Sequence, residues 1–140
     1  MESIAGILLM FAMLNPPEIP PFKVPSHKEL KCLALNVYHE ARGESYEGKL
    51  AVASVTLERL AHPKYPKTIC KVVYQPYQFS WTTNTETKKI SAKEWHESLQ
   101  AAIHAYNVPF IRATHFHNLT IKPKWGLRKV MQIGNHIFYI

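Results

Sequence analysis

The chain lacks aspartate completely, since all ten of its acidic residues are glutamate. This excludes Ser-His-Asp triads and aspartic dyads. Two cysteines are too few for a zinc site of four thiolates. The five glycines are scattered, at positions 6, 43, 48, 126 and 134, which excludes a P-loop and a dinucleotide fingerprint.

The 140 residues are 46% hydrophobic and 11% aromatic, a composition that folds around a core. The formal net charge of +7 favours polyanionic partners such as nucleic acid, an anionic membrane or an acidic wall polymer. It does not choose among them, because the basic residues are spread along the chain.

Residues 3–14 are almost wholly apolar but too short to span a membrane, which takes about 20 residues. We expect this segment to be either a helix packed on the domain or a segment that contacts the membrane. Five prolines in residues 16–25 indicate a stiff connector. We therefore expect an N-terminal segment and connector over 1–25, and one folded catalytic domain over 26–140.

Two capping boxes, Ser26 to Glu29 and Ser91 to Glu94, predict helix starts in which serine and glutamate side chains reciprocally satisfy backbone donors. Apolar residues recur at helical spacing after each. A further helix over 45–61, apolar nearly all round, is expected to be buried.

Weaker signals complete the prediction. Residues 68–74 suit a short helix, and residues 75–90 suit a loop or hairpin. Residues 113–119 indicate a strand, and Gly134-Asn135 predicts a hairpin within 130–140. The expected fold is α+β and mainly α, with a small β element.

Glu40 is the most informative side chain. On a helical wheel it lies about 20° from Leu33 and about 60° from Val37, at the border of the apolar stripe. Burial and the negative end of the helix dipole would both raise its pKa, as a general acid requires. The alternative is an ordinary helix-end glutamate paired with Arg42 or Arg59.

Several motifs together resemble the SleB/CwlJ-type cell-wall hydrolase family. They cover about residues 29–140 in the family's order. The resembling segments are Leu33 to Glu44, Gly48 to Val55, Tyr65 to Gln75, Gln78 to Trp81, Ala113 to Asn118, Pro123 to Trp125 and Ile133 to Tyr139. The family includes spore-cortex-lytic enzymes, envelope hydrolases and phage endolysins.

The resemblance implies a lysozyme-like fold and cleavage of peptidoglycan between N-acetylmuramic acid and N-acetylglucosamine, with Glu40 as the catalytic glutamate. Glu44 is the nearest glutamate for a second, supporting carboxylate, as a two-carboxylate glycosidase requires. A lytic transglycosylase needs one acid only, and we favour that mechanism over muramidase-type hydrolysis. No cofactor or metal is expected.

The resemblance also places other residues near the sugar groove. Ser80 is a supporting residue that would hold Glu40 or a substrate acetamido group, and Trp81 would stack on a sugar. His115 and His117 share one face of the strand, where a zinc half-site is the minor alternative. The full set of expected substrate-binding residues is Gln78, Trp81, Thr114, His115, His117, Asn118, Trp125 and Tyr139.

Cys32 and Cys70 lie at positions that commonly carry cysteine in envelope members of the family. A disulfide between them would contribute roughly 3–4 kcal/mol and imply an oxidising compartment such as a periplasm. Two buried free thiols are the alternative. The site of action is thus expected in the cell envelope, reached by an export route that the sequence does not identify.

The expected protein is a monomeric phage endolysin or small bacterial wall-remodelling enzyme, and the chain's end at Ile140 favours the endolysin. Peptidoglycan is its expected partner and nucleic acid is not. Two rivals stand beside this: a metal-dependent nuclease or nucleic-acid binder using His115, His117 and Asn118, and a wall-binding domain without catalysis.

Overall fold

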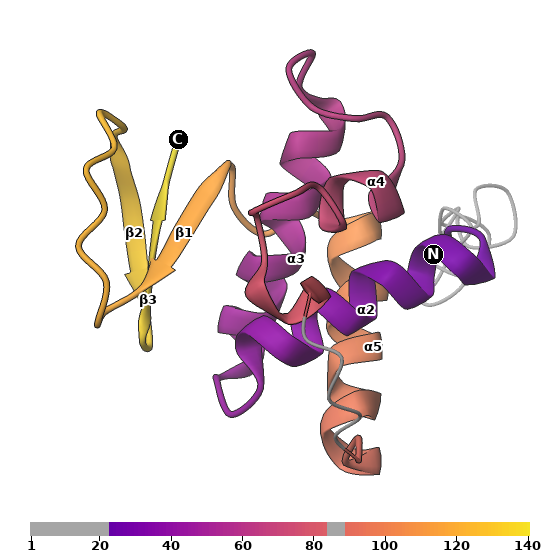
Figure 1. Cartoon of the computed structure of the whole chain (residues 1–140). Helices are drawn as coiled ribbons and strands as arrows, with labels where there is room; N and C mark the ends of the chain where they lie inside the picture. Colours follow the sequence, from indigo (N-terminus) through magenta and orange to yellow (C-terminus); the bar gives the residue numbers. More distant parts are fainter. Residues whose placement is uncertain (1–22, 84–88) are drawn as a thin grey trace, which may run out of the picture.

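The computed structural model describes residues 23–83 and 89–140 (Figure 1). The predictions for residues 3–14 and for most of the proline-rich connector lie outside these residues. The described end of the connector is held by the last turn of a helix, because the Asn107 side chain exchanges hydrogen bonds of 2.7 Å with the backbone N–H and C=O of Lys23. Within the described ranges, no helix is both long enough and apolar enough to cross a membrane.

The predicted helices are present. They are α2 (His27–Ala41), α3 (Tyr46–Ala61), α4 (Ile69–Val73) and α5 (Ala92–Asn107). A hydroxyl caps the start of each one, and the capping residues are Ser26, Ser45, Thr68 and Ser91. Gly43 follows the end of α2 with φ +85°, a conformation that glycine adopts without steric cost.

One half of each capping-box prediction is wrong, namely that the glutamate side chain bonds back to the backbone N–H of the capping serine. The Glu29 carboxylate does not serve its own helix: it accepts hydrogen bonds from the backbone N–H groups of Ile69 and Cys70 at the start of α4. Glu94 pairs instead with Lys49 of α3. Both glutamates begin their helices as predicted but satisfy partners more than 39 residues away in sequence, at separations of 40 and 45.

Helix α3 forms the centre of the core, with α2 and α5 packed against it and against each other. Its residues from Gly48 to Thr56 are all buried, as the prediction of a buried helix required. Alanines at 101, 102 and 105 form the buried face of α5 and allow close approach of the helices. The larger Trp95 and Leu99 pack at the margin.

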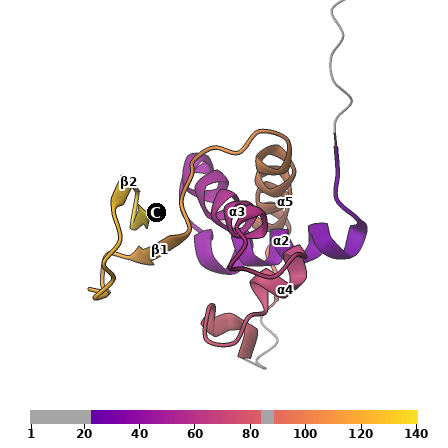
Figure 2. The ribbon, with the colours of Figure 1, turned by 90° about the horizontal axis from the view of Figure 1, so that it is seen from above.

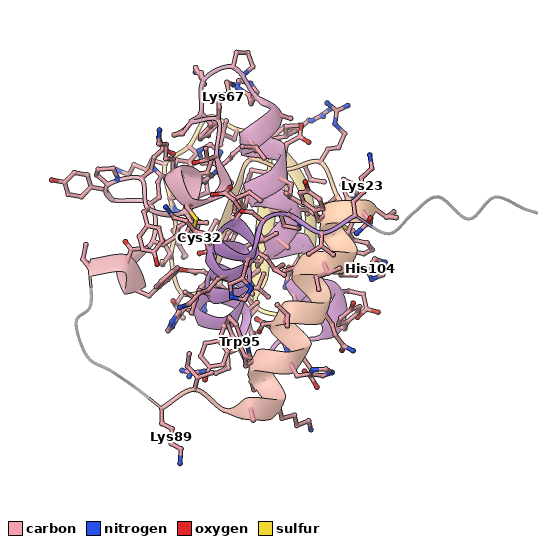
Figure 3. The ribbon with its side chains drawn as sticks, turned by 90° about the vertical axis from the view of Figure 1, so that its right-hand side faces the viewer. Lys23, Cys32, Lys67, Lys89, Trp95 and His104 are labelled. Atoms are coloured by element: carbon pink, nitrogen blue, oxygen red, sulfur yellow. A yellow bond between two sulfur atoms is a disulfide. The ribbon has the colours of Figure 1, made fainter. Side chains whose placement is uncertain are left out.

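The disulfide Cys32–Cys70 is present and joins α2 to α4, with the two Cα atoms 5.2 Å apart. Figure 3 shows its sulfur atoms beside the label of Cys32. Glu29, one turn earlier on α2, also bonds the start of α4. The alternative of free thiols is therefore wrong for this structure. Helices α2 and α4 are joined both by a disulfide and by the hydrogen bonds of Glu29.

The C-terminal region forms an antiparallel sheet in the order β1–β3–β2. Its strands are β1 (His115–Asn118), β2 (Lys129–Ile133) and β3 (His136–Tyr139). Gly134, with φ +54°, stands in the predicted turn. Figures 1 and 2 show the sheet at one side of the helices from two directions. The fully buried Phe138 anchors it to the core.

The segment predicted as a loop or hairpin is a loop in its described part. It contains the short 3₁₀ helix η1 (Ser80–Thr83). Phe79, just before η1, is buried and lies 6.2 Å from the Phe116 ring of β1, centroid to centroid. This loop therefore reaches from the helices towards the sheet.

Candidate active site

A groove of about 960 Å³ lies between the helical part and the sheet. Four segments build it: the end of α2, the loop before and within η1, strand β1 with the loop after it, and the start of β3. Its lining residues are His39, Glu40, Pro76, Tyr77, Gln78, Phe79, Ser80, Thr83, Phe116, His117, Asn118, Ile121, Trp125 and His136.

Glu40 occupies the last turn of α2 and lines this groove, as the helical wheel predicted. Burial raises the pKa of its carboxyl group to about 7 from an ordinary 4.5. Near neutral pH a large fraction of this carboxyl is therefore protonated. A protonated carboxyl in a large groove can donate a proton to a bound molecule.

The cations that would reverse this shift are engaged elsewhere. Arg42 donates to the Tyr38 hydroxyl at 3.3 Å, with its guanidinium over the same ring. Lys49 pairs with Glu94 and Glu97. These contacts leave burial as the dominant influence on the Glu40 carboxyl.

Arg59, the other predicted partner of Glu40, is buried beneath the groove wall. Its Nε donates to the carbonyl oxygen of Thr114 at 2.7 Å, and its Nη1 donates to Gln78 Oε1 at 3.1 Å. The reading of Glu40 as an ion-paired helix-end residue is therefore wrong. Arg59 instead ties the groove loop at Gln78 to the chain just before β1.

Glu44 lies outside the groove lining. Its Oε1 accepts a hydrogen bond of 3.2 Å from the backbone N–H of Asn135 and lies 3.7 Å from His136 Nδ1. The carboxylate thus holds the β2–β3 turn against the loop between α2 and α3. This geometry suits a residue that positions the sheet better than a second reacting carboxylate.

His117 and Tyr139 form a fixed pair on one face of the sheet. His117 Nδ1–H donates to the Asn118 carbonyl at 2.8 Å, so in the neutral ring Nε2 accepts from the Tyr139 hydroxyl at 2.8 Å. The Trp125 ring lies edge-on to both rings and is 40% exposed in the groove wall. His117, Asn118 and Trp125 thus reach the groove, as predicted.

His115, Thr114 and Tyr139 are not among the lining residues. His115 shares the face of His117 and contacts Trp125 at 5.0 Å, which confirms the predicted alternation. The Thr114 hydroxyl lies 3.0 Å from His115 Nδ1. His115 and Tyr139 thus contact the Trp125 ring of the groove wall, and Thr114 contacts His115.

Ser80 lines the groove, but its neighbour Trp81 does not. The Trp81 indole N–H donates to the buried Asn36 Oδ1 at 3.0 Å. One face of its ring stacks on His39 with centroids 4.5 Å apart, and Tyr74 lies edge-on to it. Trp81 therefore packs against α2, and its geometry does not suit the predicted stacking on a sugar.

Within the described ranges, no group of three or more His, Cys, Asp or Glu side chains is placed so that it could hold a metal ion. The minor reading of His115 and His117 as a zinc half-site meets a specific obstacle. Both ring nitrogens of His117 already contact protein oxygens at 2.8 Å. The same contacts remove the observation on which a metal-dependent nuclease depended.

Sequence reasoning missed several lining residues: His39, Pro76, Tyr77, Thr83, Phe116, Ile121 and His136. His136 is the most notable, because it is buried with no hydrogen-bond partner for Nδ1, and burial lowers its pKa. Strand alternation with buried Phe138 was a usable signal for it. No pattern in the neighbouring sequence indicated that His136 would lie close to Glu44.

Comparison with known proteins identifies the family. The family model described as Cell Wall Hydrolase matches residues 43–139. The chain belongs to the cell wall hydrolase family. The spore cortex-lytic enzyme of Bacillus subtilis (strain 168) is 33% identical to this cell wall hydrolase over 116 residues, which make up 81% of this chain and 38% of that protein. The enzyme of the same name from Oceanobacillus iheyensis is 32% identical over 125 residues, covering 85% and 45%.

Solved structures match this cell wall hydrolase along nearly their whole length. The catalytic domain of the germination-specific lytic transglycosylase SleB from Bacillus anthracis gives a TM-score of 0.69 at 27% identity, covering 87% of this chain and 100% of that one. The SleB catalytic domain of Bacillus cereus gives 0.72 at 27% identity, covering 87% and 95%. The expected mainly helical, lysozyme-like fold with a small β element is confirmed.

The two curated relatives are much longer than the matched region, since this chain spans only 38–45% of them. The family match also begins at residue 43, three positions after Glu40. The case for Glu40 therefore depends on the groove and on the burial of its carboxyl group.

Proposed function

We propose that this cell wall hydrolase cleaves the glycan strands of peptidoglycan between N-acetylmuramic acid and N-acetylglucosamine, with Glu40 as the catalytic acid. One observation carries the proposal: a carboxyl group whose pKa burial raises to about 7 lines a groove of about 960 Å³. The names of the relatives, spore cortex-lytic enzyme and lytic transglycosylase, support the same chemistry.

The favoured reaction is lytic transglycosylation. Protonated Glu40 donates its proton to the glycosidic oxygen as the bond from that oxygen to the muramic acid C1 breaks. The resulting carboxylate then takes the proton of the 6-hydroxyl of the same sugar, whose oxygen bonds to C1. The products are a 1,6-anhydro sugar and a free 4-hydroxyl, and Glu40 ends the cycle protonated.

The position of Glu44 favours this one-acid route over hydrolysis by two carboxylates. A glycosidase of the second kind needs both carboxyl groups at the scissile bond, about 5–9 Å apart. Glu44 instead accepts from Asn135 N–H and lies outside the groove lining. We assign it the role of holding the β2–β3 turn in place.

The polar side chains of the groove are suited to hydrogen bonding with sugar hydroxyl and acetamido groups. We assign this role to Gln78, Ser80, His117 and Asn118, all of which line the groove. Trp125 supplies an exposed aromatic edge of the same wall. We assign the role of supporting this wall to Thr114, His115 and Tyr139, on the contacts described above.

The proposed place of action is the cell envelope, where peptidoglycan is found. The Cys32–Cys70 disulfide supports this place, because such bonds persist in oxidising compartments. The net charge of +7 also suits an anionic wall. The assignment as an endolysin stays a prediction, because the relatives named above are bacterial spore enzymes.

The experiment that tests this proposal is digestion of purified peptidoglycan by the wild type and by Glu40→Gln. The wild type should release fragments with anhydro-muramyl ends, identified by mass spectrometry. Glu40→Gln should lower the rate by about 10²–10⁴-fold, the usual contribution of a general acid. The matched control is Glu47→Gln, since Glu47 is an exposed residue of α3, and it should retain full activity.

Two results would contradict the proposal at different levels. Full activity of Glu40→Gln would refute the assignment of the acid. Release of reducing ends alone would keep the cleavage but refute the transglycosylase mechanism. Wall binding by Glu40→Gln without cleavage distinguishes an enzyme from a domain that only binds the wall.

A further inference from the structure

Residues Gln75 to Gln78 form a tight turn at the groove. The backbone N–H of Gln78 donates to the Gln75 carbonyl at 3.3 Å, with Pro76 second and Tyr77 third in the turn. Tyr77 has φ +66°, and within the described ranges no other residue except glycine has a positive φ. Proline second and a positive φ third is the pattern of a type II turn, whose third position favours glycine. A tyrosine there costs conformational energy.

The Tyr77 side chain recovers none of this cost through packing. Its exposure is 101% of the reference value, so its ring is entirely in solvent. Tyr74, only three residues earlier, is 46% exposed and packs edge-on against Trp81. The backbone conformation of Tyr77 therefore costs conformational energy, and its side chain makes no packing contact that would stabilise the fold.

The turn that carries Tyr77 is firmly held. Gln78 accepts a hydrogen bond of 3.1 Å from the buried Arg59, and Phe79 is buried against the sheet. Tyr77 lines the same groove as these two neighbours and as Glu40. An exposed aromatic ring is thus presented at the edge of the groove by a fixed piece of backbone.

We propose that Tyr77 binds substrate, stacking its ring on the apolar face of a sugar of the glycan strand. This inference depends on the proposed function, because it takes the occupant of the groove to be a glycan. The C–H groups on one face of a pyranose ring carry partial positive charge and match the negative face of an aromatic ring. Because the backbone of the turn is already held, only the rotamer freedom of the Tyr77 side chain is lost on binding, which favours affinity.

The test uses variants that separate the ring from the backbone strain. Tyr77→Gly and Tyr77→Asn both suit a positive φ and remove the ring, whereas Tyr77→Phe keeps it. With soluble glycan strands as substrate, the first two should raise KM by about three- to tenfold, the effect of one aromatic contact. Their kcat should stay within about twofold, since the ring binds substrate and transition state alike. Tyr77→Phe should behave as the wild type.

Thermal unfolding supplies the readout that a structural role would change. The Tm of Tyr77→Gly should equal or exceed that of the wild type, because the strain is relieved. Wild-type KM in both Gly and Asn variants would overturn the proposal, as would an equal loss in Tyr77→Phe. A fall in Tm that accompanies the loss in both variants would overturn it as well.

Glu40→Gln, measured alongside, separates this inference from the proposed function. If the wild type cleaves glycan and Glu40→Gln does not, unchanged Tyr77 variants refute the sugar contact alone. If the wild type releases no glycan fragments, the proposed function fails and the assignment of Tyr77 fails with it.

Discussion

Two ionisable side chains of this protein are shielded from water, one with oppositely charged partners and the other without them. Lys49, in the middle of α3, is 1% exposed, and its ammonium group lies 3.0 and 2.7 Å from the carboxylates of Glu94 and Glu97. Glu40, at the end of α2, has its pKa raised by burial, while Arg42 and Arg59 point to other partners.

This difference distinguishes an ionised group that stabilises the fold, Lys49, from a group suited to proton transfer, Glu40. Lys49 stays charged because two carboxylates compensate its loss of hydration. Glu40 lacks that compensation, so it holds its proton up to about pH 7. A catalytic acid must be able to gain and lose a proton under working conditions, and pairing with a cation would prevent this.

The largest effect on stability is expected for Glu40→Gln at high pH. The folded state holds the proton up to about pH 7 and the unfolded state only to about 4.5, so wild-type stability falls as pH rises between these values. Well above pH 7 the accumulated cost is roughly 3 kcal/mol. Glu40→Gln should be more stable than the wild type by that amount at pH 8 and about equal at pH 4. Chemical denaturation at both pH values measures this.

Glu47→Gln is the control, and it should change the free energy of unfolding by less than about 1 kcal/mol at either pH. An equal gain for Glu40→Gln at pH 4 and pH 8 would show that ionisation of Glu40 is not its cause. The contrast between Glu40 and Lys49 would then lose its basis.

Replacement of Lys49 should have the opposite sign. Lys49→Met keeps the length of the side chain but leaves two carboxylates together without a cation. Because the Glu94 and Glu97 side chains are 26% and 38% exposed, water compensates part of the loss. We expect a loss of about 1–2 kcal/mol in the free energy of unfolding at pH 7, with kcat/KM unchanged. A variant as stable as the wild type would mean that the pairing contributes nothing net.

The last prediction concerns catalysis and is a change of rate with pH. If Glu40 acts first as an acid, kcat/KM should fall by about tenfold per pH unit above its pKa of about 7. A pH profile on soluble glycan strands from pH 5 to 9 measures the fall, and Lys49→Met should show the same midpoint. A rate that stays constant through pH 9 would be incompatible with Glu40 as the acid.

What the sequence predicted correctly depends on neighbours within one turn of helix or one hairpin. The place of Glu40 beside the apolar stripe follows from helical periodicity, and the burial of α3 follows from its composition. The β2–β3 turn follows from Gly134-Asn135. The disulfide had support from the family resemblance alone.

What the sequence did not predict depends on contacts between distant segments. The Glu29 carboxylate bonds the start of α4, 40 residues on, because the disulfide joint brings that helix end beside it. Trp81 was expected in the groove, but the buried amide of Asn36 offers its N–H a partner inside. The turn that carries Tyr77 is held at the groove by Arg59, which lies 19 residues before Gln78 in sequence and donates to its side chain.

Gly134 lies directly against the Glu44 carboxylate. A Cβ atom at this position would stand 2.6 Å from Glu44 Oε2, so a side chain here would push the Glu44 carboxylate away from Asn135 N–H. The φ of +54° would be strained at the same time. The missing side chain at Gly134 therefore leaves the space in which the Glu44 carboxylate reaches Asn135 N–H and joins the loop after α2 to the β2–β3 turn.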